Sequence, residues 1–272
     1  MKETTKRFEI GCCSPIEYYE LIADSGFDYI DILGWQLFSL TRQELSNFLA
    51  LTKRIGLPCT RISGYCRKSP AIVGENYDPV ETREYARVLC GRAAILGVEY
   101  IGIGSPLARV LPDNYSKSIA DEQCAEFLAA TAEEAGKYGI QILFEAIHPG
   151  FCNYLNSTAE CYSLIKQLSI PNLHLVLDLY HMKRNGESIY DIGKYLDEIR
   201  YIHISTDLGG TKRGLYTAQD VSEAEETCSV IKRSGYTGCI SFEPDTQMIV
   251  KQNLKEALGL ARFHLEENTN GL

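Results

Sequence analysis

The feature that most constrains the fold is a regular alternation between short apolar runs and longer stretches with helical periodicity. Each run holds about five β-prone residues, which is the pattern of a strand buried on both faces. The runs recur about every 30 residues, the usual length of a βα unit. We expect strands over 8–13, 27–33, 57–63, 98–104, 142–147, 173–179, 201–205 and 238–244.

The stretches between the runs carry helix signals at their ends. Thr41 stands three residues before Glu44, as in a capping box, and Gly56 follows the last turn. Pro79 stands near the first turn of another helix, where its missing N–H has no consequence. We expect helices over 15–26, 41–56, 78–97, 118–139, 157–168, 188–198, 222–234 and 250–267.

Strands that alternate with helices must lie parallel, because each connection crosses over one face of the sheet. Eight such units close into a (β/α)8 TIM barrel, and a chain of 272 residues has the size of one. No Gly- or Pro-rich linker divides the chain, so residues 1–272 are predicted to form a single domain. The alternative, an open sheet that binds a dinucleotide, requires a GxGxxG turn where this chain has CCSPIEYYE.

Composition excludes several classes of protein. A net charge of −9 argues against a nucleic-acid partner, since phosphate backbones require clustered Lys and Arg. The N-terminus, MKETTKRFEIGCC, has no apolar signal region, and no run reaches about 18 apolar residues. We therefore expect a cytoplasmic protein without a membrane partner. The ten cysteines form no CxxC pair, so we expect reduced, small core residues.

The last four strands each end on a side chain that can bind a metal or move a proton. These residues, the Glu–Asp–His–Glu set, are Glu145, Asp178, His203 and Glu243. One acid at a strand end is often only a helix N-cap or a loop ion pair, but four in succession favour a site at the barrel mouth. Three carboxylates and an imidazole suit Mn²⁺, Mg²⁺ or Co²⁺, and a cation offsets the repulsion between the acids.

Three stretches in the second half of the chain resemble a known superfamily. They read EEAGKYGIQILFEAIHP, NYLNST and LVLDLYHM, between residues 133 and 182. They are similar to the xylose isomerase-like sugar phosphate isomerases and epimerases, and within these to the D-tagatose and D-psicose 3-epimerases. The resemblance implies an isomerase whose Glu–Asp–His–Glu set binds one divalent cation, with Mn²⁺ preferred. It also implies that His181, in a D-x-x-H motif, contacts the substrate.

The implied chemistry is proton transfer beside the carbonyl of a sugar or related polyol, through a cis-enediolate. Glu145 and Glu243 would lie on opposite faces of the substrate. One would remove a proton and the other return it, which inverts the carbon. If a single carboxylate moves the proton between neighbouring carbons, the result is aldose–ketose isomerisation. A homodimer or homotetramer is also implied by the resemblance.

The chain departs from the epimerase pattern at two positions. The epimerases carry a glutamate six residues after the fifth-strand ligand, where this chain has Phe151. They carry an arginine about six residues after the seventh-strand histidine, where this chain has Gly209. Lys212 or Arg213 could reach the site from a longer loop, and we expect Arg213, His148 and Asp31 to complete the substrate contacts.

Other members of the superfamily give alternative functions. Endonuclease IV-like enzymes place histidines after strands three and four, where this chain reads ISGYC and IGIGSP. That class is therefore excluded. Inosose dehydratase-like lyases, hydroxypyruvate isomerase-like enzymes and a C-glycoside-cleaving subunit share the fold and stay open. An inactive barrel that serves as a binding subunit also stays open, although all four ligand positions are intact.

Overall fold

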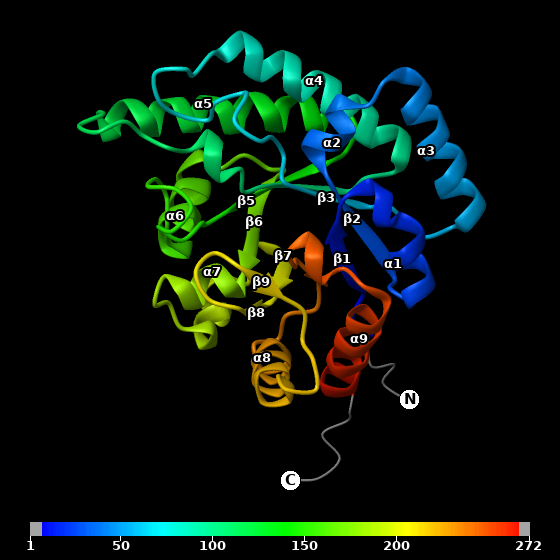
Figure 1. Ribbon diagram of the computed structural model, residues 1–272. Helices are drawn as coiled ribbons and strands as arrows, with labels where there is room; N and C mark the ends of the chain where they lie inside the picture. Colours follow the sequence, from blue (N-terminus) through cyan, green and yellow to red (C-terminus); the bar gives the residue numbers. More distant parts are fainter. Residues whose placement is uncertain (1–6, 267–272) are drawn as a thin grey trace, which may run out of the picture.

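Eight parallel strands close into a barrel in the order β1–β10–β7–β6–β5–β4–β3–β2 (Figure 1). This computed structural model describes residues 7–266. Each barrel strand lies within a run predicted from the sequence or overlaps it, so the predicted TIM barrel is confirmed. The strands are β1 Ile10–Ser14, β2 Tyr29–Leu33, β3 Arg61–Ser63, β4 Tyr100–Ile103, β5 Gln141–Glu145, β6 Leu173–Asp178, β7 Ile199–Ile204 and β10 Cys239–Phe242.

Helices surround the strands, as Figure 1 shows. The predicted capping box of Thr41 and Glu44 is present at the start of α3. The residue predicted to end the last helix, 267, lies outside the described residues. The helices are α1 Tyr19–Ser25, α2 Gly34–Ser39, α3 Arg42–Ile55, α4 Pro79–Leu96, α5 Lys117–Gly136, α6 Thr158–Leu168, α7 Leu179–Arg184, α8 Val221–Arg233 and α9 Lys251–Glu266, with 3-10 turns η1 Ile16–Tyr18, η2 Pro106–Ala108, η3 Ile189–Tyr195 and η4 Thr246–Met248.

The structure differs from the expected elements mainly in the second half of the chain. The helix predicted over 188–198 is the 3-10 segment η3, and the α-helix of this unit is the short α7. Helix α7 begins directly after β6 because Asp178 Oδ1 accepts the amides of Tyr180 and His181, at 2.7 and 3.2 Å. A small antiparallel hairpin, β8 Thr206–Asp207 with β9 Arg213–Gly214, was not predicted, since two-residue strands leave no periodic pattern.

The barrel interior is divided into an apolar layer and a polar layer above it. The lower layer is formed by Tyr29, Leu143, Val176, Tyr201 and Cys239, with Tyr100 packed against them. Because side chains alternate along a strand, the residues two positions further on project into the same interior. On β2 that residue is Asp31, and on β7 it is His203. The polar layer therefore lies next to a packed layer of tyrosine and smaller apolar side chains.

All ten cysteines are buried and none forms a disulfide. Burial raises the pKa of the thiols of Cys66 and Cys124 to about 12. The prediction that the cysteines are core residues is confirmed, and their reduced state stays a prediction. Within residues 7–266, no helix is both long enough and apolar enough to cross a membrane.

Candidate metal centre

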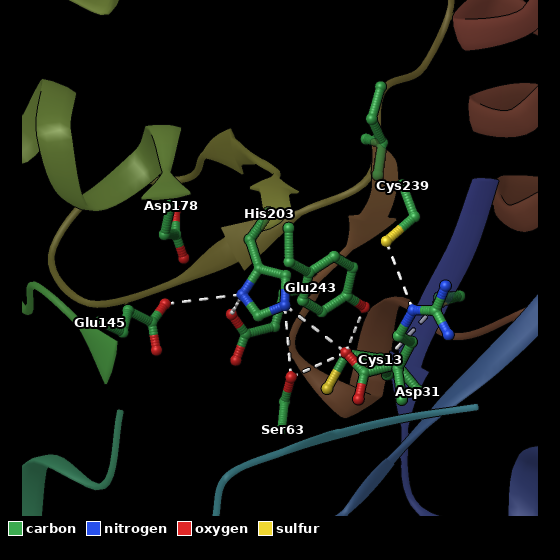
Figure 2. A network of polar contacts seen from close by, with 12 residues as sticks. Cys13, Asp31, Ser63, Glu145, Asp178, His203, Cys239 and Glu243 are labelled. Carbon is green, nitrogen blue, oxygen red and sulfur yellow. Dashed lines mark hydrogen bonds and ion pairs between the residues drawn. The ribbon is translucent and has the colours of Figure 1, made fainter. Parts of the chain in front are cut away.

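The Glu–Asp–His–Glu set converges at the C-terminal end of the barrel (Figure 2). Each of the four side chains offers one ligand atom, and these atoms all lie within 4.8 Å of one another. Glu145 and Asp178 are the last residues of β5 and β6, His203 lies on β7, and Glu243 follows β10 directly. The barrel thus gathers four groups that are far apart in the sequence, as expected from their strand-end positions.

The donor atoms of this set are not satisfied by one another. His203 Nδ1 lies 3.0 Å from Glu243 Oε2 and 3.5 Å from Glu145 Oε1. Both are within ion-pair distance, but neither contact has the geometry of a hydrogen bond, and within the described residues both His203 Nδ1 and Glu145 Oε1 are buried without a hydrogen-bond partner. Unpaired buried acceptors are unfavourable, so the arrangement fits a cation that all four groups would share.

Burial and charge make the carboxylates of the set unequal. Burial raises the pKa of Asp178 to about 7; Arg213 opposes this shift, and Glu145 and Glu243 add to it. Burial also disfavours ionisation of Glu243, but Arg213 and His203 outweigh it and hold the pKa of Glu243 well below its usual range. In the protein without metal, Asp178 therefore takes up a proton more readily than Glu243.

Arg213 reaches the set from the β8–β9 hairpin. Its Nη1 lies 2.7 Å from Glu243 Oε2 and 3.1 Å from Asp178 Oδ2, and its Nη2 lies 3.0 Å from Glu243 Oε1. The paired contact with Glu243 is the fork geometry in which arginine binds carboxylates most strongly. The structure thus places Arg213 beside the set, by way of a hairpin that the sequence did not reveal.

His148 and His181 pack beside the set with their rings 5.2 Å apart. His181 Nε2 lies 3.8 Å from Asp178 Oδ2. The amide of Gly150 donates to His148 Nδ1 at 3.0 Å, so the neutral ring carries its proton on Nε2, which is buried without a partner among the described residues. Phe151, in place of the epimerase glutamate, packs against both rings. Contact of either histidine with substrate stays a prediction.

Asp31 lies behind His203 rather than on the open side of the set (Figure 2). Its side chain is completely buried, and Oδ2 accepts hydrogen bonds from Ser63 Oγ at 2.7 Å and Tyr201 Oη at 2.6 Å. Nothing in this position supports the predicted contact with substrate. Sequence reasoning missed Ser63 and Tyr201, although Tyr201 stands two residues before His203 and so projects into the same interior.

Arg109 supports Glu145 from the helix side of the barrel wall. This buried guanidinium donates from Nη1 to the Glu145 carbonyl oxygen at 2.9 Å and lies 4.8 Å from the centre of the Phe144 ring. Within residues 7–266, no carboxylate lies within ion-pair distance of it. Arg109 follows the short turn η2 and belongs to no motif, so this role could not be predicted from the sequence.

Gly104→Ala is expected to displace the Glu145 carboxylate, because a Cβ at position 104 would overlap Glu145 Oε2. Groups that orient metal ligands contribute about 10–100-fold to affinity, and we expect a loss of Mn²⁺ affinity in this range by titration calorimetry. Gly102→Ala, two residues earlier in β4, is the matched control, since its Cβ would meet no atom closer than 3.4 Å. Equal affinity of the two folded variants would contradict this prediction.

A closed parallel barrel with three carboxylates and an imidazole at the C-terminal ends of its strands defines a TIM-barrel enzyme whose site suits a divalent cation. Residues 19–263 match the family model described as xylose isomerase-like TIM barrel, and the chain belongs to this family. The resemblance noted in the sequence is thereby confirmed.

Two relatives and one solved structure illustrate the family. An L-ribulose 3-epimerase from Methylomonas sp. is 26% identical over 243 residues, which cover 87% of this chain and 80% of the relative. An inosose isomerase from Halalkalibacterium halodurans is 24% identical over 260 residues, covering 91% and 87%. The crystal structure of a D-allulose 3-epimerase from Methylomonas sp. has a TM-score of 0.79 and 20% identity, covering 96% of this chain and 99% of that one. These proteins are named as epimerases and isomerases, in agreement with the predicted enzyme class.

Proposed function

We propose that this protein is a divalent-metal-dependent sugar isomerase or epimerase that moves a proton beside the carbonyl of a ketose or related polyol. The observation that carries the proposal is the convergence of the Glu–Asp–His–Glu set within 4.8 Å, with buried acceptors left unpaired. The relatives named L-ribulose 3-epimerase and inosose isomerase support a sugar or polyol as the substrate.

The Glu–Asp–His–Glu set would hold the cation. Its oxygen-rich donors favour Mn²⁺, with Mg²⁺ and Co²⁺ as alternatives. When bound, the ion supplies Lewis-acid polarisation of the substrate carbonyl and its neighbouring hydroxyl. Arg213, His181 and His148 would orient the substrate oxygens, since each brings an N–H donor beside the set.

The two glutamates would transfer the proton. Glu145 on β5 and Glu243 after β10 are separated around the barrel by β6 and β7, so they approach the centre from different sides. One carboxylate would take the proton from carbon to give a cis-enediolate, and the other would return a proton to the opposite face. This arrangement favours epimerisation, with inversion at the reacting carbon.

A second reaction of the same class is aldose–ketose or inosose isomerisation. The relative named inosose isomerase favours it, because that name specifies isomerisation of a ketone on a polyol ring. In this reaction a single carboxylate would carry the proton between neighbouring carbons. The cytoplasmic location and a homodimeric or homotetrameric assembly stay predictions.

A deuterium-exchange experiment tests the proposal. The protein is loaded with Mn²⁺, exchanged into D₂O and incubated with a panel of ketoses and inososes, and the products are examined by NMR. We expect deuterium at one carbon next to the carbonyl, together with a new epimer or isomer. Asp178→Ala, which removes a ligand that is neither proposed base, should lose metal and exchange together. Metal-loaded protein that exchanges no substrate of the panel would refute the enzyme activity.

Metal affinity is expected to fall as the pH is lowered through about 7. Asp178 has its pKa raised to about 7, so below this pH a proton must leave the carboxyl before a cation can bind. Burial lowers the pKa of His203, but Glu243, Asp31 and Glu145 outweigh it and hold this pKa well above its usual range, so His203 must also lose a proton. We expect the apparent Mn²⁺ affinity to decrease with falling pH, by about tenfold more per pH unit once Asp178 is protonated below about 7. Titration calorimetry in two buffers of different ionisation enthalpy measures the affinity and the released proton. A pH-independent affinity across this range would contradict the assignment.

A further inference from the structure

Asp31 is a completely buried carboxylate with a single cationic neighbour. Among the described residues, the one Lys, Arg or His nitrogen within 4.0 Å of it is His203 Nε2, at 3.5 Å. A buried carboxylate is costly to desolvate, and the one cationic group close to Asp31 in the described part of the chain is the imidazole of His203, which indicates a function in relation to that residue.

The hydrogen bonds around Asp31 determine where the proton of His203 lies. An ionised carboxylate only accepts, so the hydroxyls of Ser63 and Tyr201 both donate to Asp31 Oδ2, at 2.7 and 2.6 Å. Since its own proton is used in this way, Ser63 Oγ can only accept from His203 Nε2, at 3.2 Å. The Nε2–H bond therefore points to Ser63 and Asp31, and Nδ1 is the ring nitrogen that faces Glu145 and Glu243.

Asp31 approaches His203 from the opposite wall of the barrel. Strand β7, which carries His203, is separated from β2 by β10 and β1, so Asp31 reaches His203 across the interior. Figure 2 shows the imidazole with Glu145 on one side and with Ser63 and Asp31 on the other. A residue from the same wall could not approach the imidazole from behind in this way, because neighbouring side chains on a sheet stand parallel to each other.

We propose that Asp31 is a positioning residue that fixes the tautomer and ring orientation of His203 through Nε2, directly and by way of Ser63, while Tyr201 holds Asp31 in place. The inference rests on the proposed function, in which His203 Nδ1 is a metal ligand. A carboxylate behind a ligating imidazole also increases its electron donation to the metal. Asp31 thus acts on the cation site without touching the cation or the substrate.

The test compares three purified variants with the native protein by Mn²⁺ titration and by the visible absorption of the Co²⁺ form. Asp31→Asn removes the charge, and Ser63→Ala removes the hydroxyl between Asp31 and His203. Ser241→Ala is the matched control, because Ser241 is the register partner of His203 on β10, is completely buried, and has a hydroxyl without a partner in the described part of the chain. We expect affinity to fall about 10–100-fold in the first two variants and to be unchanged in the third.

Several outcomes separate this role from a structural one. Weaker binding with an altered Co²⁺ spectrum, and activity restored by excess Mn²⁺, would support positioning. Variants that unfold at lower temperature but bind Mn²⁺ like the native protein would overturn it, while the proposed function would stand. If Asp31→Asn does not fold, Ser63→Ala decides between these outcomes. Native protein that binds none of Mn²⁺, Mg²⁺ and Co²⁺ would overturn both proposals.

Discussion

Exchange of either Glu145 or Glu243 for glutamine is expected to lower the rate of epimerisation by about 10²–10⁴-fold, because a general base or acid contributes that much to a proton transfer. The two variants should differ in what they retain. With one glutamate intact, the enzyme can still remove a proton from the face which that glutamate addresses and return solvent deuterium to the same face. One variant should therefore incorporate solvent deuterium only into the substrate epimer, and the other only into the product epimer.

The measurement follows deuterium entry into each epimer separately, by NMR, with metal content determined for every variant. Glutamine keeps a carbonyl oxygen as a ligand, whereas Asp178→Ala removes the ligand oxygen altogether, at a residue that is in neither proton-transfer role, and should abolish exchange of both epimers. A single-base mechanism predicts a different pattern, in which one glutamate variant loses all exchange and the other loses none. That pattern would identify an aldose–ketose type of isomerase.

Removal of the cation is expected to abolish activity and to lower the melting temperature. Three carboxylates whose ligand atoms lie within 4.8 Å repel one another in a buried site, and a cation that binds only the folded state removes this repulsion. At a metal concentration of about 100 times Kd, binding stabilises the folded protein by about 2.7 kcal/mol. For a chain of this size, that corresponds to about 5–10 °C in Tm.

Thermal unfolding with chelator and with added Mn²⁺ measures this difference, and activity is followed in the same samples. Asp178→Ala serves as the control that should show no cation-dependent shift, since one ligand is missing. Chelated protein that keeps its full rate, with metal content verified as negligible, would show that the Glu–Asp–His–Glu set has another purpose.

Much of the fold was predictable, because buried parallel strands leave a local signal. The apolar runs located all eight barrel strands, and the capping box at Thr41 located the start of α3. The short elements were not predictable. Helix α7 spans six residues and is initiated by Asp178, and the β8–β9 hairpin has two residues in each strand, so neither produces a period long enough to detect.

Site residues were predictable where a single side chain at the end of a strand indicated the function. They were not predictable where the function of a residue depends on a neighbour from across the barrel. Asp178 shows both aspects: Oδ1 caps α7, as an isolated strand-end acid often does, while Oδ2 faces Arg213 in the Glu–Asp–His–Glu set. Asp31 was recognised as polar and near the site, but its partners Ser63 and Tyr201 lie 32 and 170 residues away in the sequence. Only the closed barrel shows that it faces the back of His203.

The ten buried thiols provide a built-in reporter of opening motions. In the native protein they are shielded from solvent, so an alkylating reagent reacts only when the surrounding segment opens. Because the cysteines are distributed from β1 to β10, mass spectrometry of the labelled peptides would give an opening free energy for most of the barrel without any engineered probe. A comparison with and without Mn²⁺ would then show how far the rigidity imposed by one cation extends through the barrel wall.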